Sequence, residues 1–195
     1  MKTKLTKQEK NWILYDVGNS AFTLLAATIL PIYFNYIAGK QGLSDVQYLA
    51  YWGYAVSIAT LLTALAGSVF GTVADTKGYK KPVFTIALGI GAIASVALGF
   101  AKYWLGFLIV FVIAKVGYSV TLVFYDSMLV DVTSEDRMDE VSSQGYAWGY
   151  IGSCVPFVIC LLVVLNAGKI GITMETAMMV SFVIITVWWV IMTLP

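Results

Sequence analysis

The sequence predicts an all-α membrane protein, a polytopic bundle of six transmembrane helices. Hydrophobic residues make up 59% of the 195 residues and charged residues only 12%, whereas an ordinary globular chain carries about 25% charged residues. The apolar residues also form six runs, each long enough to cross a bilayer, which takes roughly 20 helical residues. Composition and run length together therefore exclude a soluble fold.

The six runs follow one another with short connections that hold most of the charge. This spacing leaves no room for a soluble domain or a long linker, so we expect residues 1–195 to form one domain. The expected spans are Trp12–Ala38, Tyr48–Val73, Val83–Ala101, Trp104–Tyr125, Ser143–Leu165 and Thr176–Leu194.

The first span carries a polar stripe. Asp16, Asn19, Ser20 and Thr23 recur at spacings of three and four residues, so they share one helical face. The run is also too long for a cleaved signal peptide, and Asp16 and Asn19 interrupt its start, so we expect it to be retained. The stripe either makes interhelical hydrogen bonds near the interface or lines an aqueous cavity in which Asp16 is a charged group.

The loop between the second and third spans reads Gly71-Thr-Val-Ala-Asp75-Thr-Lys-Gly78-Tyr-Lys80-Lys81. Gly71 permits a close helix approach, Asp75 can accept hydrogen bonds from nearby backbone N–H groups, and Gly78 can adopt a positive φ. Lys80 and Lys81 are expected to stay in water. Another tight cytoplasmic turn would share these properties.

The fourth span holds Lys115 near its middle. A lysine at that depth costs roughly 2.5–3.5 kcal/mol, so it should face the bundle interior or a wet cavity. A structural ion pair, or a side chain that snorkels along the helix, is the alternative. Ser119, Leu122 and Asp126 continue the same face, with Tyr118 beside them. We expect this stripe and that of the first span to face one shared cavity.

The connection between the fourth and fifth spans, residues 131–140, is acidic. In one interpretation, this acidic segment is simply a solvated surface. Alternatively, it pairs with the basic loop after the second span and steadies a closed state.

Small residues four apart mark two expected packing seams, because they let helix backbones approach closely in lipid. The fifth span has Gly145, Gly149 and Ser153 at this spacing, and the second has Gly67 and Gly71.

The basic residues predict the orientation of the bundle, because cytoplasmic loops carry an excess of lysine and arginine. The larger group falls on one side of a six-span arrangement, which places both termini in the cytoplasm. We expect the chain to lie in the cell (inner) membrane. This group is Lys2, Lys4, Lys7, Lys10, Lys77, Lys80, Lys81 and Arg137, against Lys40, Lys102 and Lys169.

The Gly71–Lys81 loop resembles the signature loop of the major facilitator superfamily, which helps to gate the cytoplasmic side, although Tyr79 stands where that family usually has Arg. Further segments resemble its branch of autophagy-related vacuolar amino-acid effluxers and their bacterial relatives, although that branch often has Asn at the position of Asp126. These segments are Trp12-Ile-Leu-Tyr-Asp-Val-Gly-Asn-Ser-Ala-Phe22, Pro31-Ile-Tyr-Phe34, Phe124-Tyr-Asp126 and Gly145-Tyr-Ala-Trp-Gly-Tyr-Ile-Gly152.

The resemblance implies the amino-terminal six-helix half of a facilitator, which moves a small solute such as an amino acid by alternating access. Facilitator halves run parallel, so the expected partners are membrane lipid, the solute and a second half, either another copy in a homodimer or a separate carboxy-terminal half. A non-transporting scaffold or regulatory subunit is the alternative function.

An intramembrane aspartyl protease is the remote alternative, suggested by the pairs Tyr15-Asp16 and Tyr125-Asp126. That class carries Gly-x-Gly-Asp where this chain has Val123-Phe-Tyr-Asp126. The chain has no histidine, which removes His-based metal sites and catalytic triads. We therefore expect no enzyme activity, cofactor, metal or nucleic-acid partner.

Overall fold

The computed structural model describes residues 4–76 and 78–195, so the predicted positions of Lys2 and Lys77 lie outside the described residues. It confirms six helices long and apolar enough to cross a membrane, and the described residues form no strand. The long helices are α1 (Lys7–Lys40), α2 (Asp45–Ala74), α3 (Lys80–Ala97), α4 (Trp104–Ser127), α6 (Met138–Leu165) and α7 (Met174–Thr193). The short ones are η1 (Leu98–Phe100), α5 (Leu129–Val132) and η2 (Glu135–Arg137).

Capping groups explain why α1 and α2 begin several residues before their apolar runs. The Thr6 hydroxyl accepts a hydrogen bond from the Glu9 N–H, and the Glu9 carboxylate accepts one from the Thr6 N–H. Ser44 and Gln47 form the same reciprocal box at the start of α2. Such boxes satisfy N–H groups that the first helical turn leaves free, so polar residues can extend the helix into the interface.

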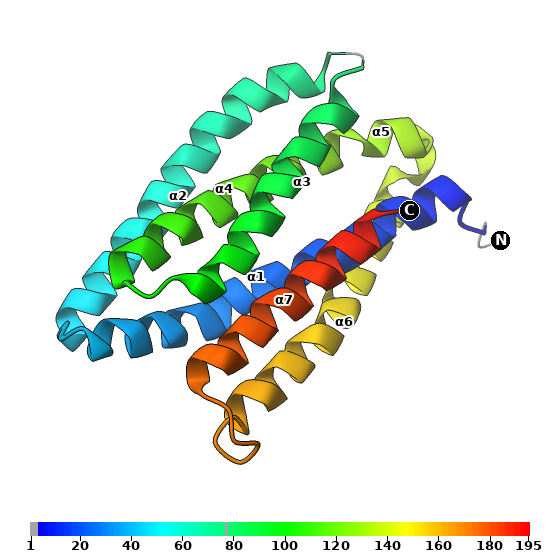
Figure 1. Cartoon of the computed structure of the whole chain (residues 1–195). Helices are drawn as coiled ribbons and strands as arrows, with labels where there is room; N and C mark the ends of the chain where they lie inside the picture. The colour runs from blue at the N-terminus through cyan, green and yellow to red at the C-terminus, as the bar shows by residue number, and fades with distance from the viewer. Residues whose placement is uncertain (1–3, 77) are drawn as a thin grey trace.

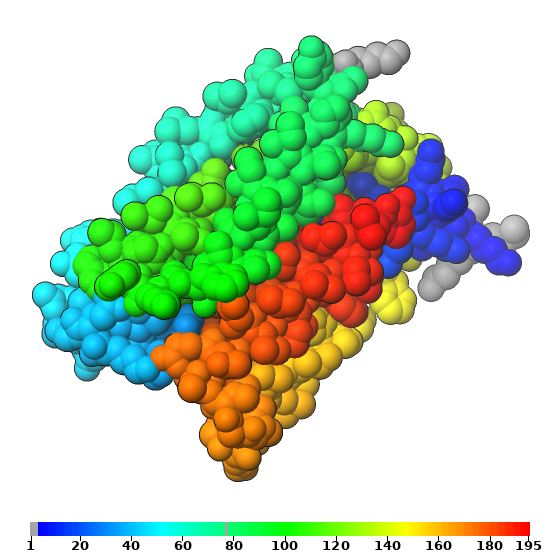
Figure 2. All heavy atoms as spheres, in the orientation of Figure 1, coloured from blue at the N-terminus to red at the C-terminus, as the bar shows by residue number. Residues whose placement is uncertain are grey.

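Helix α1 is the central element of the bundle (Figure 1). It packs against α6 and α7 on one side and against α2 and α4 on the other, while α3 lies between α4 and α7. Figure 2 shows the side chains of α3 and α7 meeting along the viewed face. The core between these helices is aromatic, with Phe22, Phe34, Phe107, Phe182 and Trp189 fully buried.

Both termini lie at the same end of the bundle (Figure 1). The Asn11 side-chain amide donates a hydrogen bond to the Pro195 carbonyl at 2.9 Å, which joins the start of α1 to the end of the chain. The α2–α3 loop and the α4–α6 connection lie at this end too, because two spans precede the first and four precede the second.

The two expected glycine seams have different outcomes. On α6, Gly145, Gly149 and Ser153 are buried, and a Cβ on either glycine would meet α1 side chains, so this seam is confirmed. The seam expected on α2 is wrong, since a Cβ at Gly67 or Gly71 would meet nothing within 4 Å. The reason is that α2 buries only 6% of its most apolar window, which leaves both glycines on an open surface of this chain.

Candidate functional site

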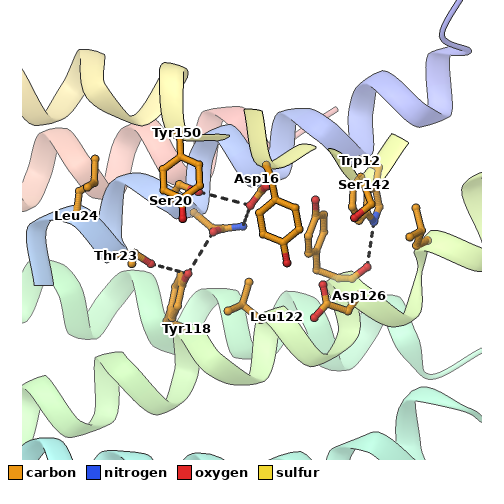
Figure 3. A pocket seen from close by; sticks show the side chains of 14 residues that line it. Trp12, Asp16, Ser20, Thr23, Leu24, Tyr118, Leu122, Asp126, Ser142 and Tyr150 are labelled. Atoms are coloured by element: carbon orange, nitrogen blue, oxygen red, sulfur yellow. Dashed lines mark hydrogen bonds between the residues drawn. The ribbon is translucent and has the colours of Figure 1, made fainter. Parts of the chain in front are cut away.

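A cavity of about 410 Å³ opens between α1, α4, α5 and α6 (Figure 3). It brings together six of the predicted pathway residues from two helices. Its lining also includes a third helix, α6, that the sequence did not predict to contribute. The lining residues are Trp12, Asp16, Asn19, Ser20, Thr23, Leu24, Tyr118, Leu122, Tyr125, Asp126, Leu129, Ser142, Tyr146 and Tyr150.

The polar stripe of α1 forms one wall of the cavity. Asp16 and Asn19 are buried, although they lie in a membrane-spanning helix. The Asp16 Oδ1 atom accepts hydrogen bonds from Asn19 Nδ2 at 3.3 Å and from Ser20 Oγ at 3.5 Å. Residues three and four apart lie on the same side of a helix, so the local helical geometry alone brings these groups together.

Tyr118 links this wall to α4. The Thr23 hydroxyl donates a hydrogen bond to the Tyr118 oxygen at 2.7 Å, and the Tyr118 hydroxyl donates one to Asn19 Oδ1 at 3.2 Å. The chain of hydrogen bonds therefore runs from Thr23 through Tyr118 and Asn19 to Asp16. Figure 3 shows Thr23, Tyr118 and Asp16 around the cavity. The α1 stripe thus makes interhelical hydrogen bonds and also faces a cavity that it shares with α4.

The end of α4 supplies Tyr125 and Asp126. Trp12 stacks on the Tyr125 ring with centroids 4.2 Å apart, and its indole N–H donates to the Tyr125 carbonyl at 3.0 Å. The Tyr125 hydroxyl is buried and has no hydrogen-bond partner among the described residues. Asp126 is exposed at the cavity and forms no hydrogen bond or ion pair with another described residue.

Helix α6 approaches α1 closely because it presents glycine to Asp16. A Cβ at Gly149 would lie 2.9 Å from Asp16 Oδ2 and 3.1 Å from the Ser20 hydroxyl. A Cβ at Gly145 would lie 2.8 Å from the Trp12 ring. A larger residue at either position would push α6 away from the carboxylate.

Ser142, Tyr146 and Tyr150 are the site residues of α6 that sequence reasoning missed. They recur every four residues, so they share a face. That spacing was a usable signal, but tyrosines near a membrane interface also suit an aromatic belt. The tyrosines are exposed, so α6 forms an open side of the cavity.

Lys115 and Ser119 are predicted pathway residues that do not line the cavity. Lys115 is half-buried, and its ammonium lies 5.1 Å from the centroid of the Tyr118 ring, a ring that does line it. Ser119 is buried without contributing to the wall. Lys115 shares the helical face of Leu122 but lies two turns away, beyond the cavity.

The Gly71–Lys81 loop lies beside the α4–α5 junction. Gly78 has a φ of +91°, as predicted for this turn. The Lys80 ammonium forms an ion pair with Asp131 at 2.6 Å and donates to the Ser127 carbonyl at 2.9 Å. The basic loop and the acidic connection are thus joined, which was one of the two interpretations of that connection. No hydrogen bond joins the Asp75 carboxylate to another described residue, and Lys81 is exposed.

The cavity wall combines polar and aromatic groups. It offers carboxylates, hydroxyls, an amide and aromatic rings. Within residues 4–76 and 78–195, no group of three or more Cys, Asp or Glu side chains is placed to hold a metal ion.

Comparison with known proteins finds one matching family, described as "Vacuole effluxer Atg22 like", over residues 5–138 and 130–195. The uncharacterized MFS-type transporter YxiO of Bacillus subtilis is 38% identical over 200 residues, which cover 100% of this chain and 47% of the relative. An uncharacterized protein of Aquifex aeolicus is 24% identical over 161 residues, covering 81% of this chain and 40% of the relative. The chain spans about half the length of these curated relatives. No solved structure gave a significant match.

Proposed function

This chain belongs to the family of Atg22-like vacuole effluxers, of the major facilitator type, and we propose that it forms a six-helix half of a transporter that moves a small solute by alternating access. The observation that carries the proposal is the cavity between α1, α4 and α6, which holds polar groups inside membrane-spanning helices. Such groups are expensive in lipid and mark solute or ion pathways. A family of transporters gives no support to the intramembrane protease interpretation.

The open side of the cavity supports pairing with a second six-helix half. Asp126, Tyr146 and Tyr150 are all exposed there. Asp126 is the second-last residue of α4, near the membrane interface, and a carboxylate there still favours water or a protein surface over lipid. Facilitator halves are related by an axis along the membrane normal, and a parallel second half, either another copy or a separate carboxy-terminal half, would enclose the cavity between the two bundles.

The distribution of charge supports a cytoplasmic location for both termini, in the cell (inner) membrane. The bundle end that holds the termini also carries most of the described basic residues, including Lys80, Lys81 and Arg137, whereas Lys40, Lys102 and Lys169 lie at the other end. Under the positive-inside rule, the first end faces the cytoplasm.

The Lys80–Asp131 ion pair fits a gating role for the Gly71–Lys81 loop. It fastens the start of α3 to the segment after α4, directly beyond the cavity residue Leu129. In the proposed cycle, this contact steadies one of the two access states. Because Asp131 is exposed, the pair is weak enough to break during turnover.

Amino acids or similar metabolites are the proposed solute class, on the resemblance to vacuolar amino-acid effluxers. Of the predicted pathway residues, Asp16, Asn19, Ser20, Thr23, Tyr118 and Asp126 touch the solute in this proposal. Lys115 and Ser119 act from outside the cavity wall, Lys115 through the Tyr118 ring.

The test is uptake by liposomes that contain either the chain alone or two copies joined in tandem. Both termini lie at one end of the bundle, so a flexible linker can join two parallel copies without crossing the membrane. We expect the tandem protein to take up at least one radiolabelled amino acid and Asp16→Asn to abolish that uptake, while the matched change Asp45→Asn, at the start of α2 and outside the cavity, leaves it intact. The proposal is refuted if the tandem protein takes up none of the solutes, and if co-expression of the chain with a separate six-helix half does not produce uptake either.

A further inference from the structure

We propose that the cavity between α1, α4 and α6 selects organic cations, and that it binds the ammonium group of an amine between Asp16, Asp126 and the aromatic rings around them. The inference rests on the proposed function in one respect, since it takes this cavity as the solute site. It adds the charge of the group that the site binds.

The two carboxylates leave acceptor capacity free for a donor in the cavity. Both hydrogen bonds that Asp16 receives end on Oδ1, and Oδ2 accepts none from another described residue. Asp126 accepts no hydrogen bond and forms no ion pair within the described chain. A carboxylate in a half-buried site is stabilised by a charged donor more than by a neutral one, so both positions favour an ammonium group.

The Tyr125 hydroxyl is an independent sign of a missing partner. Tyr125 lines the cavity, only 5% of its surface is exposed, and its hydroxyl has no hydrogen-bond partner within residues 4–76 and 78–195. Buried polar groups without a partner cost about 1–3 kcal/mol, so native structures seldom keep them without a reason. The oxygen itself has less than 1 Å² of accessible surface, so a bound ammonium would donate a hydrogen bond to it after a small shift of the Tyr125 ring.

Aromatic rings form much of the remaining wall. Trp12, Tyr118, Tyr125, Tyr146 and Tyr150 all line the cavity, and ring faces attract organic cations as the aromatic cages for alkylammonium ligands do. Tyr118 already shows this affinity, because the Lys115 ammonium lies 5.1 Å from its ring centroid. Carboxylates combined with rings suit an alkylammonium better than a small hydrated metal ion, which prefers several oxygen ligands.

The described residues that line the cavity include no lysine or arginine. A solute carboxylate would therefore face Asp16 and Asp126 without a counter-charge. The cavity of this half should reject anions, and the negative end of a zwitterion must lie outside it, towards the second half.

The experiment measures binding to the purified 195-residue chain by isothermal titration calorimetry, so it requires no transport. The probes are 3-methylbutylammonium, the uncharged 3-methylbutanol and the anion 4-methylpentanoate, which share a branched alkyl group. We expect the ammonium to bind at least tenfold more tightly than the alcohol and the anion not to bind. Asp16→Asn and Asp126→Asn should each weaken ammonium binding about tenfold, the scale of one charge-assisted hydrogen bond, with the alcohol unaffected.

Asp136→Asn is the matched control, because Asp136 is exposed and lies outside the cavity wall. Helix content by circular dichroism shows whether each variant folds. If Asp16→Asn does not fold, Asp126→Asn decides the test, since Asp126 has no hydrogen bond to lose to any residue that the structure describes.

Equal binding of ammonium and alcohol overturns the proposal, as does unchanged ammonium affinity in a folded Asp126→Asn variant. Displacement of the ammonium by equimolar sodium chloride would identify a site for inorganic cations and overturn it too. These outcomes are separate from the uptake assay. A protein that transports only neutral or anionic solutes would refute the charge preference and leave the transporter function standing.

Discussion

Replacement of Gly117 by alanine should destabilise the bundle at the contact between α3 and α4. A Cβ at Gly117 would lie 2.9 Å from the Gly91 nitrogen and 3.0 Å from the Gly91 Cα. Both are backbone atoms, so no side-chain rotation can relieve the overlap and the two helices must separate. Overpacking of this kind costs about 1–3 kcal/mol. The separation of the helices should also disturb the cavity, because Gly117 directly precedes the lining residue Tyr118.

Gly89→Ala is the matched control for this change. Gly89 lies inside α3, and a Cβ there would meet nothing within 4 Å. Both substitutions gain the same helix propensity, up to about 1 kcal/mol, so the difference between them isolates the steric cost. Unfolding in mixed micelles with a rising mole fraction of SDS, followed by far-ultraviolet circular dichroism, measures each free energy of unfolding.

We expect Gly117→Ala to be less stable than Gly89→Ala by about 1–3 kcal/mol. If both variants are as stable as the parent chain, α3 and α4 do not approach at Gly117 as described. A loss of stability at Gly89 of the same size would mean that the substitution acts through something other than backbone contact.

Four further substitutions test the site and the loop. Tyr118→Phe removes two hydrogen bonds to α1 and should cost about 1–3 kcal/mol in the same unfolding assay; a variant as stable as the parent chain would argue against the network. Asp131→Ala should cost less than about 1 kcal/mol, since the pair is exposed, whereas Lys80→Ala should cost more because Lys80 also binds a carbonyl at the end of α4. The opposite order would contradict the described contacts. Lys115→Ala should lower uptake less than Asp16→Asn does in the tandem protein, because Lys115 contacts Tyr118 and lies outside the cavity wall; a complete loss would place Lys115 in the pathway itself.

Sequence reasoning located the helices and one side of the site for a simple physical reason. A run of about 20 apolar residues has few alternatives to a membrane-spanning helix, and polar residues three or four apart within it must share a face that avoids lipid. Asp16, Asn19 and Tyr118 were therefore identifiable before their neighbours were known. The Lys80–Asp131 pair was foreseeable too, since opposite charges fell in two connections at the same end of the bundle.

The remaining features depend on tertiary contacts that no local pattern encodes. Lys115 follows the same stripe as Leu122, but the cavity ends before it, and only packing decides where a cavity ends. Gly67 and Gly71 have the spacing of a seam, yet α2 presents them to open space. A spacing rule identifies which residues share a face and leaves open which helix that face meets.

Helix α6 both packs against α1 through its glycines and lines the open side of the cavity through its tyrosines. Gly145 and Gly149 precede Tyr146 and Tyr150 by one residue each, so the glycine edge and the tyrosine edge lie about 100° apart around the helix. The glycines hold α6 against Asp16, and the tyrosines line the open side of the cavity. A rotation of α6 that moves the tyrosines must also move the glycines away from the Asp16 carboxylate. In the proposed transport cycle, a second half that contacts these tyrosines therefore acts on the packing around Asp16 through the rigid helix between them.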